Sequence, residues 1–139
     1  MVLGEKLWEG KGKTMGMAIK SVDAEGVKIE ATWMAQLKGL GKAKGVDGAV
    51  TFTGIVMMGP SGAGWSHGQG MFNMMTGDMA VVKGSGYGKV ETGKSKTVGI
   101  WSFMTMSQKL GWMNNVVAII TQEGDPQWME FDVTINEWK

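Results

Sequence analysis

His67 is the chain's single histidine, and imidazole is the side chain best suited to acid–base chemistry near neutral pH. It lies in a glycine-rich stretch, residues 64–70. A lone histidine cannot build a multi-histidine metal site, and the absence of cysteine excludes thiolate ligands and thiol nucleophiles. We therefore predict no metal site and no cofactor, and regard His67 either as a surface residue or as a polar anchor for a ligand.

Residues 88–95 match the pattern of a phosphate-binding loop, with glycines at 88 and 93 followed by Lys94 and Ser95. Such a loop binds phosphate because it connects a strand to a helix whose N-terminal amides face the ligand. The residues that follow, 96–103, read as a strand instead. We interpret the stretch as a lysine-rich hairpin turn and expect no nucleotide hydrolysis.

Two carboxylates, Glu30 and Glu123, lie near the ends of apolar segments. Together with His67 they are the candidates for isomerase, cyclase or hydrolase chemistry, provided that they point into the fold. The other closely spaced carboxylates lie near turns or alternate with apolar residues, which is typical of solvated surface.

Aromatic residues offer a different kind of site. Trp33, Trp101 and Phe103 fall on the apolar faces of their segments, where they would either line a cavity or fill a core. Asn73 lies among large apolar residues and would need a partner if buried. With Asn115 as a further polar anchor, the candidate ligand-binding residues are Trp33, His67, Asn73, Trp101, Phe103 and Asn115.

The elements that must position these residues are strands. Residues 27–38 alternate apolar and polar side chains, and the glycine of the preceding turn, 23–26, favours a hairpin. The same pattern predicts eight strands, separated by glycine-rich turns, and a single antiparallel eight-stranded barrel domain over residues 1–139. One short helical turn is expected, near 107–113. The expected strands span 6–22, 27–38, 46–58, 63–75, 79–90, 96–105, 115–123 and 127–138.

Glycines recur at a spacing of two, in Gly10-x-Gly12, Gly68-x-Gly70 and Gly84-x-Gly86-x-Gly88. Because residues two apart share one face of a strand, each set leaves that face without side chains. We interpret these stripes mainly as corners where the barrel curves. Several strands, such as 116–120, are apolar on both faces, which predicts that part of the outer face packs on another subunit and that the protein is a homo-oligomer. The alternative is that the segment 107–114 or a chain terminus folds across part of this face.

Charge and hydropathy exclude other classes of protein. The 14 basic residues are all lysines, and 13 carboxylates balance all but one of their charges, for a formal net charge of +1. Without arginine or excess positive charge, we expect no nucleic-acid partner. No apolar run is long enough for a membrane helix and the first residues lack a signal-peptide pattern, so we expect no membrane span and a cytoplasmic location.

The last third of the chain carries a resemblance. Residues 101–110, 114–117 and 137–139, with the preceding glycine stripes, resemble an uncharacterised family of small prokaryotic proteins. In general pattern they are also similar to the barrel superfamily of allene oxide cyclase and, more distantly, the lipocalins. The resemblance implies an eight-stranded barrel with a cavity for an apolar small molecule, and it transfers no catalytic residue.

Three hypotheses remain open at this point. The first is a barrel that binds an apolar or aromatic small molecule in its interior. The second is a homo-oligomeric structural or interaction protein whose barrel is packed solid. The third is an isomerase-type or cyclase-type enzyme that acts inside the barrel.

Overall fold

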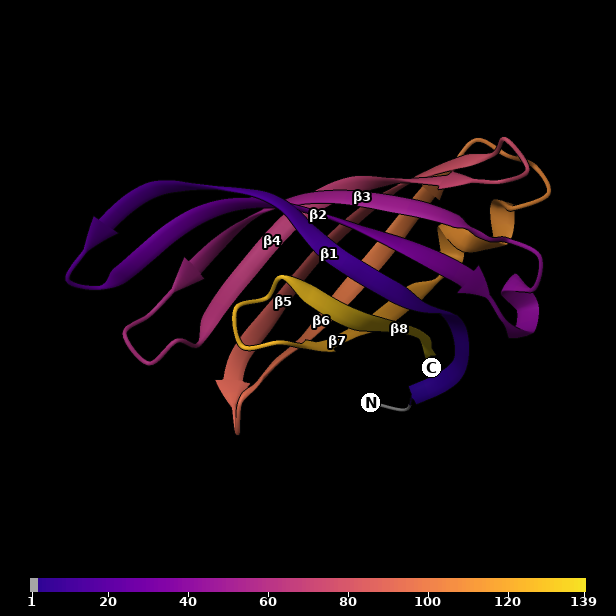
Figure 1. Ribbon diagram of the computed structural model, residues 1–139. Helices are drawn as coiled ribbons and strands as arrows, with labels where there is room; N and C mark the ends of the chain where they lie inside the picture. The colour runs from indigo at the N-terminus through magenta and orange to yellow at the C-terminus, as the bar shows by residue number, and fades with distance from the viewer. Residues whose placement is uncertain (1–2) are drawn as a thin grey trace.

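The computed structural model describes residues 3–139 and confirms the predicted antiparallel eight-stranded barrel. Each strand pairs with the next along the chain, and β8 returns to pair with β1, so that the sheet closes (Figure 1). The strands are β1 (Leu3–Asp23), β2 (Gly26–Gly39), β3 (Gly48–Met58), β4 (Gly64–Met74), β5 (Met79–Glu91), β6 (Lys94–Thr105), β7 (Val117–Gly124) and β8 (Glu130–Trp138).

Two short 3-10 helices interrupt the strands. The expected helical turn is present as η2 (Gly111–Asn115), so Asn115 belongs to this helix and not to a strand. A second one, η1 (Gly41–Ala43), was not predicted. It forms where Gly41 takes a φ of 56° and buries Ala43 against the core. Among the described residues, no helix is long and apolar enough to cross a membrane.

The barrel has two different ends. At the hairpin end lie the turns of the hairpins β1–β2, β3–β4, β5–β6 and β7–β8. At the capped end lie η1, η2, the start of β1 and the end of β8 (Figure 1). The hairpin β1–β2 projects beyond the closed part of the barrel, at the left of the view. Pairing of β1 with β8 extends only to Lys13 and Glu130, whereas pairing with β2 continues to Asp23.

The pairing of β1 with β8 shifts register between Leu3 and Lys6 and between Lys6 and Trp8. Two further bulges, in the pairing of β1 with β2, set which side chains of the projecting hairpin face inward. One lies between Thr14 and Gly16, the other between Ile19 and Ser21. Each adds one residue and therefore reverses the alternation of the strand. As a result Thr14 faces inward before the first bulge, and Met17 and Ile19 face inward after it, opposite inward residues of β2.

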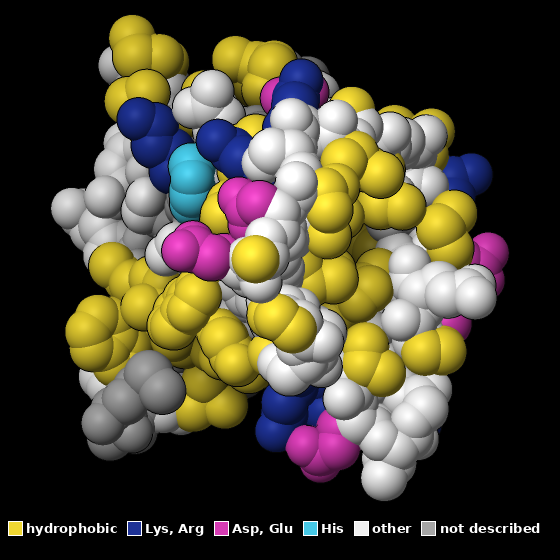
Figure 2. Space-filling model, turned by 90° about the vertical axis from the view of Figure 1, so that its left-hand side faces the viewer, with side chains coloured by type: hydrophobic (Ala, Val, Ile, Leu, Met, Phe, Trp, Pro, Cys, Tyr) yellow, Lys and Arg dark blue, Asp and Glu magenta, His cyan; other side chains and the backbone are white. Residues whose placement is uncertain are grey.

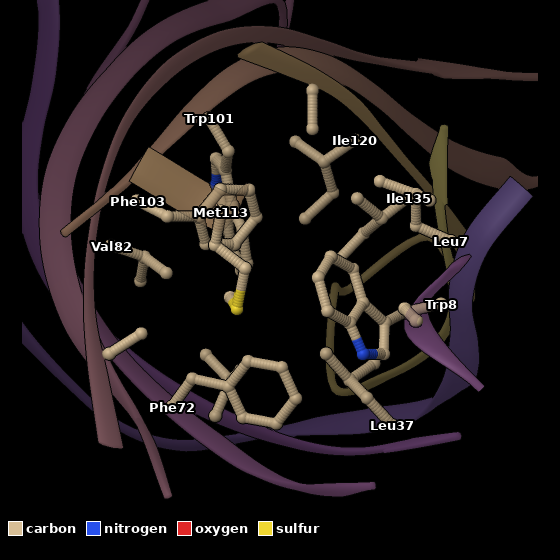
Figure 3. Packing of buried hydrophobic residues seen from close by; sticks show 14 of the residues in the cluster. Leu7, Trp8, Leu37, Phe72, Val82, Trp101, Phe103, Met113, Ile120 and Ile135 are labelled. Carbon is tan, nitrogen blue, oxygen red and sulfur yellow. The ribbon is translucent and has the colours of Figure 1, made fainter. Parts of the chain in front are cut away.

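The capped half of the barrel is packed with side chains (Figure 3). Trp8 is fully buried at its centre and contacts Phe72 and Phe103, each at 5.5 Å between ring centroids. The indole Nε1 of Trp8 donates a hydrogen bond of 2.9 Å to the carbonyl of Val46. Met113 of η2 is fully buried and completes the packing from the end. This half holds the hydrophobic core.

The outer face is apolar in places, as the doubly apolar strands predict. Met57, Trp65, Tyr87 and Val98 are partners in successive strand pairs from β3 to β6, and all four are exposed. The rings of Trp65 and Tyr87 meet edge to face at 4.7 Å. These four residues, named the outer row below, form a contiguous apolar surface.

Candidate functional site

The hairpin half of the barrel contains a pocket with a volume of about 130 Å³. Figure 2, which looks onto the side of the molecule where the hairpins project, shows hydrophobic side chains gathered around a recess. Its walls come from β1 to β8 and from the β7–β8 turn, and most of the contributing side chains are apolar. The lining includes Trp33, Phe52, Phe131, Trp128, Thr97 and Gln122.

Aromatic rings form the floor of the pocket. Trp33 stacks on Phe52 at 5.3 Å and on Trp101 at 5.8 Å, with interplanar angles of 24° and 14°. Phe131 meets Trp33 edge to face at 5.5 Å. Trp101 lies behind the floor and is 3% exposed. This aromatic layer separates the pocket from the packed capped half, so the barrel is neither hollow throughout nor solid throughout.

The glycine stripes leave room for these rings. A Cβ atom added to Gly84 would lie 2.3 Å from Cδ1 of Trp101, and one added to Gly12 would lie 2.4 Å from Cε2 of Phe131. Both distances are far below van der Waals contact, so neither glycine tolerates a side chain without movement of a ring. Our interpretation of the glycine stripes as corners of the barrel is therefore incomplete. The stripes also make room for the aromatic rings of the floor and for Trp101 behind it.

The polar groups of the pocket are uncharged. Thr97 of β6 and Gln122 of β7 lie opposite each other in the sheet. Among the described residues that line the pocket, no other two polar residues are paired in this way. Thr14 uses its hydroxyl to donate a hydrogen bond of 2.5 Å to the carbonyl of Trp128. None of the residues that line this pocket has an ionisable side chain. Such walls suit a neutral molecule and provide no general acid or base.

The structure separates the six predicted ligand-binding residues. Trp33 lines the pocket, Trp101 supports it from behind, and Phe103 lies in the core beside Trp8. His67 and Asn73 are exposed on the outer face of β4, because the inward residues of that strand are its even-numbered ones, including Phe72. Asn115 is exposed at the end of η2. The expectation that these three polar residues anchor an interior ligand does not agree with their placement.

The carboxylates considered for catalysis also lie outside. Glu123 is exposed and pairs with Lys94 at 3.2 Å. Glu30 alternates with the inward residues Ala31 and Ile29 of β2 and therefore points outward. Acid–base chemistry inside the barrel by His67, Glu30 and Glu123 is consequently excluded by their positions.

Residues 88–95, which match the pattern of a phosphate-binding loop, form a hairpin. Thr92 and Gly93 form the turn between β5 and β6, with φ values of 50° and 76°. A strand follows where a phosphate-binding loop requires a helix. The interpretation of this stretch as a turn is confirmed.

Five of the pocket residues named above were not predicted. Phe52, Thr97, Gln122 and Phe131 all obey the inward alternation of their strands, so strand register would have found them. Trp128 is different, since it lies in the β7–β8 turn within a range expected to be strand. Nothing in the local sequence pattern indicates that its ring turns back over the pocket.

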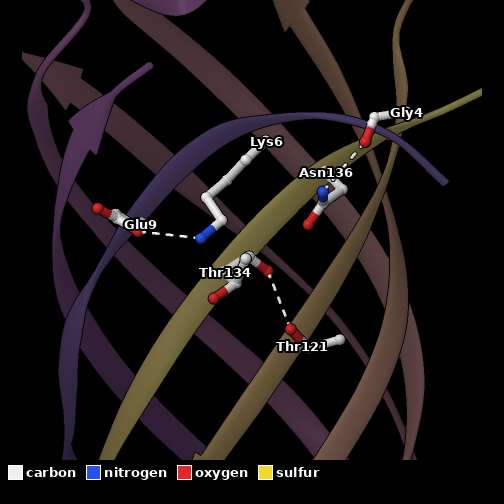
Figure 4. Close-up of polar contacts among 6 residues, drawn as sticks. All are labelled: Gly4, Lys6, Glu9, Thr121, Thr134 and Asn136. Atoms are coloured by element: carbon white, nitrogen blue, oxygen red, sulfur yellow. Dashed lines mark hydrogen bonds and ion pairs between the residues drawn. The ribbon is translucent and has the colours of Figure 1, made fainter. Parts of the chain in front are cut away.

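Two wider hollows lie on the outer surface over β1, β8, β7 and β6, with volumes of about 580 and 600 Å³. Ion pairs cross them, from Lys11 to Asp132 at 2.8 Å and from Lys94 to Glu123 at 3.2 Å. Figure 4 shows further polar contacts of this region, including Thr121 to Thr134 across β7 and β8. Because these charges are exposed and already paired, we assign the candidate site to the interior pocket.

Comparison with known proteins supports the fold. No protein-family model and no curated protein matches the chain. A protein with unknown function from Clostridium acetobutylicum ATCC 824 matches with a TM-score of 0.82 at 14% identity, covering 100% of both chains. A beta-barrel like protein from Acinetobacter baumannii AYE matches with 0.80 at 13% identity, over 99% of this chain and 96% of that one.

A third structure, described as an enzyme from Penicillium herquei, matches with a TM-score of 0.62 at 19% identity, over 96% of this chain and 92% of that one. At such identities the likeness is one of fold alone. The small β-barrel expected from the sequence is confirmed. The specific resemblance to allene oxide cyclase and the lipocalins stays a prediction.

Proposed function

We propose that the chain binds a small, neutral, apolar or aromatic molecule in the pocket of its hairpin half. The observation that supports this most is the combination of an aromatic floor with walls that carry no ionisable group. An apolar cavity of about 150 Å³ accommodates one benzene molecule, so a pocket of about 130 Å³ suits a single ring or a short branched chain.

The walls also predict what the pocket rejects. A charged group moved from water into this site would lose its hydration and find no opposite charge among the lining residues. A neutral hydroxyl, carbonyl or amide would instead meet Thr97 and Gln122. We therefore expect phenol and benzene to bind and the benzoate and benzylammonium ions to be excluded.

Titration of the protein with these four compounds tests the proposal. Indole N–H resonances of Trp33 and Trp101 are expected to shift with benzene and phenol at millimolar concentration, whereas the resonance of Trp65 on the outer face stays constant. The substitution Ala31→Leu fills the pocket and should abolish the shifts. Ala49→Leu, on the outer face of β3, is its matched control and should preserve them. Binding of the ions as tight as that of benzene, or no shift with either neutral compound, would refute the proposal.

A second proposal concerns self-association. The outer row exposes 67% of Trp65 and 41% of Tyr87 in one contiguous surface, and exposed apolar patches of this kind mark contact surfaces. We propose that the chain forms a homo-oligomer through this face. Light scattering of the wild type should give a mass above 15.0 kDa, and Trp65→Lys should return it to the monomer mass. A monomeric wild type at micromolar concentration would refute it.

A further inference from the structure

Trp128 has a backbone conformation that its side chain disfavours. Its φ is 62°, in the left-handed region, where Thr92 is the other non-glycine residue among those described. Glycine or asparagine usually occupies such a position, because a Cβ atom there crowds the backbone. A bulky residue stays in this conformation only when its surroundings impose it, and such residues concentrate at ligand clamps and active sites.

The carboxylate of Asp125 imposes the conformation from within the turn. Its Oδ1 accepts hydrogen bonds from the backbone amides of Gln127 at 2.9 Å and Met129 at 3.1 Å. Its Oδ2 accepts one from the amide of Glu130 at 2.7 Å. The amide of Trp128 itself donates to the carbonyl of Asp125 at 3.1 Å. One side chain thus fixes the backbone on both sides of Trp128.

Strand β1 holds the same turn from outside. The hydroxyl of Thr14 donates to the carbonyl of Trp128, and the amide of Thr14 donates to the carbonyl of Met129 at 2.9 Å. Thr14 is the last residue of β1 before its first bulge, so the turn is attached where the closed part of the barrel ends.

The ring of Trp128 reaches from the β7–β8 turn to strand β5. A Cβ atom added to Gly88 would lie 2.8 Å from Cη2 of Trp128, so the end of the indole packs on the backbone of β5. Gly88 pairs with Thr97, and Thr97 with Gln122, which forms a row across β5, β6 and β7. All four residues line the pocket. The indole therefore extends from the β7–β8 turn over this row.

We infer that Trp128 closes the pocket over the bound molecule and that Asp125 is the positioning residue that holds Trp128 closed. The inference rests on the proposed binding function and adds to it a specific gate. A ligand enters and leaves by displacement of the β7–β8 turn, and the indole supplies a face that meets the ligand. Asp125 does not contact the ligand and acts through the turn.

Release of benzene, measured by NMR exchange, tests the gate. Trp128→Gly keeps the left-handed backbone without strain and removes the indole, so benzene should dissociate at least about tenfold faster, since changes at a binding site act mostly on dissociation. Asp125→Ala should also accelerate release. In the double variant, Asp125→Ala should add nothing to Trp128→Gly, because Asp125 acts only through the indole. Asp23→Ala changes a carboxylate that caps the β1–β2 turn and is the matched control, with unchanged release.

The outcomes separate the gate from the proposed function. Unchanged release in Trp128→Gly would overturn the gate, and additive effects in the double variant would overturn the role of Asp125. Exchange of xenon, which enters apolar cavities, supplies a readout that does not depend on the proposed ligand. If the wild type does not bind benzene but xenon exchanges faster in Trp128→Gly, the result supports the gate and refutes the proposed ligand class. Unchanged xenon exchange overturns the gate.

Discussion

The indole of Trp101 lies against the backbone of Gly84 on the neighbouring strand, so close that a Cβ atom at Gly84 would be 2.3 Å from Cδ1 of the ring. Trp101 in turn stacks on Phe52 and Trp33, with 5.5 Å and 5.8 Å between ring centroids. Gly84 therefore determines where Trp101 lies behind the aromatic floor, as Gly12 does for Phe131 within it.

Gly84→Ala should destabilise the protein, because the added methyl group forces Trp101 out of its place in the stack. Overpacking of this kind costs about 1–3 kcal/mol in free energy of unfolding. Urea denaturation followed by circular dichroism measures it. Gly16→Ala is the control, since a Cβ atom at Gly16 meets no atom within 4 Å. Equal stability of the two variants would contradict the seating of Trp101 on Gly84.

Trp8→Phe tests the packing of the capped half. The substitution leaves the carbonyl of Val46 without its 2.9 Å hydrogen bond and opens space beside Phe72 and Phe103. A lost buried partner costs about 1–3 kcal/mol, before any cost of the cavity. We expect a lower urea midpoint with an unchanged slope. Trp138→Phe, at an exposed site on β8, should leave the midpoint within error.

The Asp125 carboxyl should titrate at unusually low pH. Hydrogen bonds from the amides of Met129 and Glu130 hold its pKa below the ordinary value, since they favour the charged form. Because the pKa is lower in the folded state, this carboxylate stabilises the fold fully above its unfolded pKa, and the contribution is lost as pH falls through the folded pKa. Carbon-13 NMR of the side chain should give a midpoint below that of a model aspartate, and a midpoint at or above it would contradict the hydrogen bonds.

Polar residues on the outer face should not affect ligand binding. His67→Ala, Asn73→Ala and Asn115→Ala are each expected to bind benzene as the wild type does, because all three side chains lie outside the pocket. Trp33→Ala removes part of the floor and should weaken binding by about tenfold or more, as loss of a central aromatic contact does. Calorimetric titration compares the four variants. Weaker binding in any of the three polar variants would place the ligand elsewhere.

Local pattern was enough to define the barrel. Alternation in residues 27–38 and the glycine turns predict eight strands, since side-chain direction in a strand has a period of two and a turn with positive φ favours glycine. The same alternation places Trp33 and Trp101 inward, where the structure has them. When Phe72 is taken as an inward residue of β4, the same alternation places His67 and Asn73 on the outer face.

Only the tertiary structure decided which half of the barrel is packed and which holds a pocket. Trp8 and Trp33 both point into the barrel, yet Trp112 of η2 stacks on the ring of Trp8 at 6.1 Å, whereas the space beside Trp33 is the pocket. The position of Trp128 likewise depends on Thr14, 114 residues away along the chain, and on Gly88 across two strands. Contacts between residues so distant in sequence arise from closure of the sheet, and no local period encodes them.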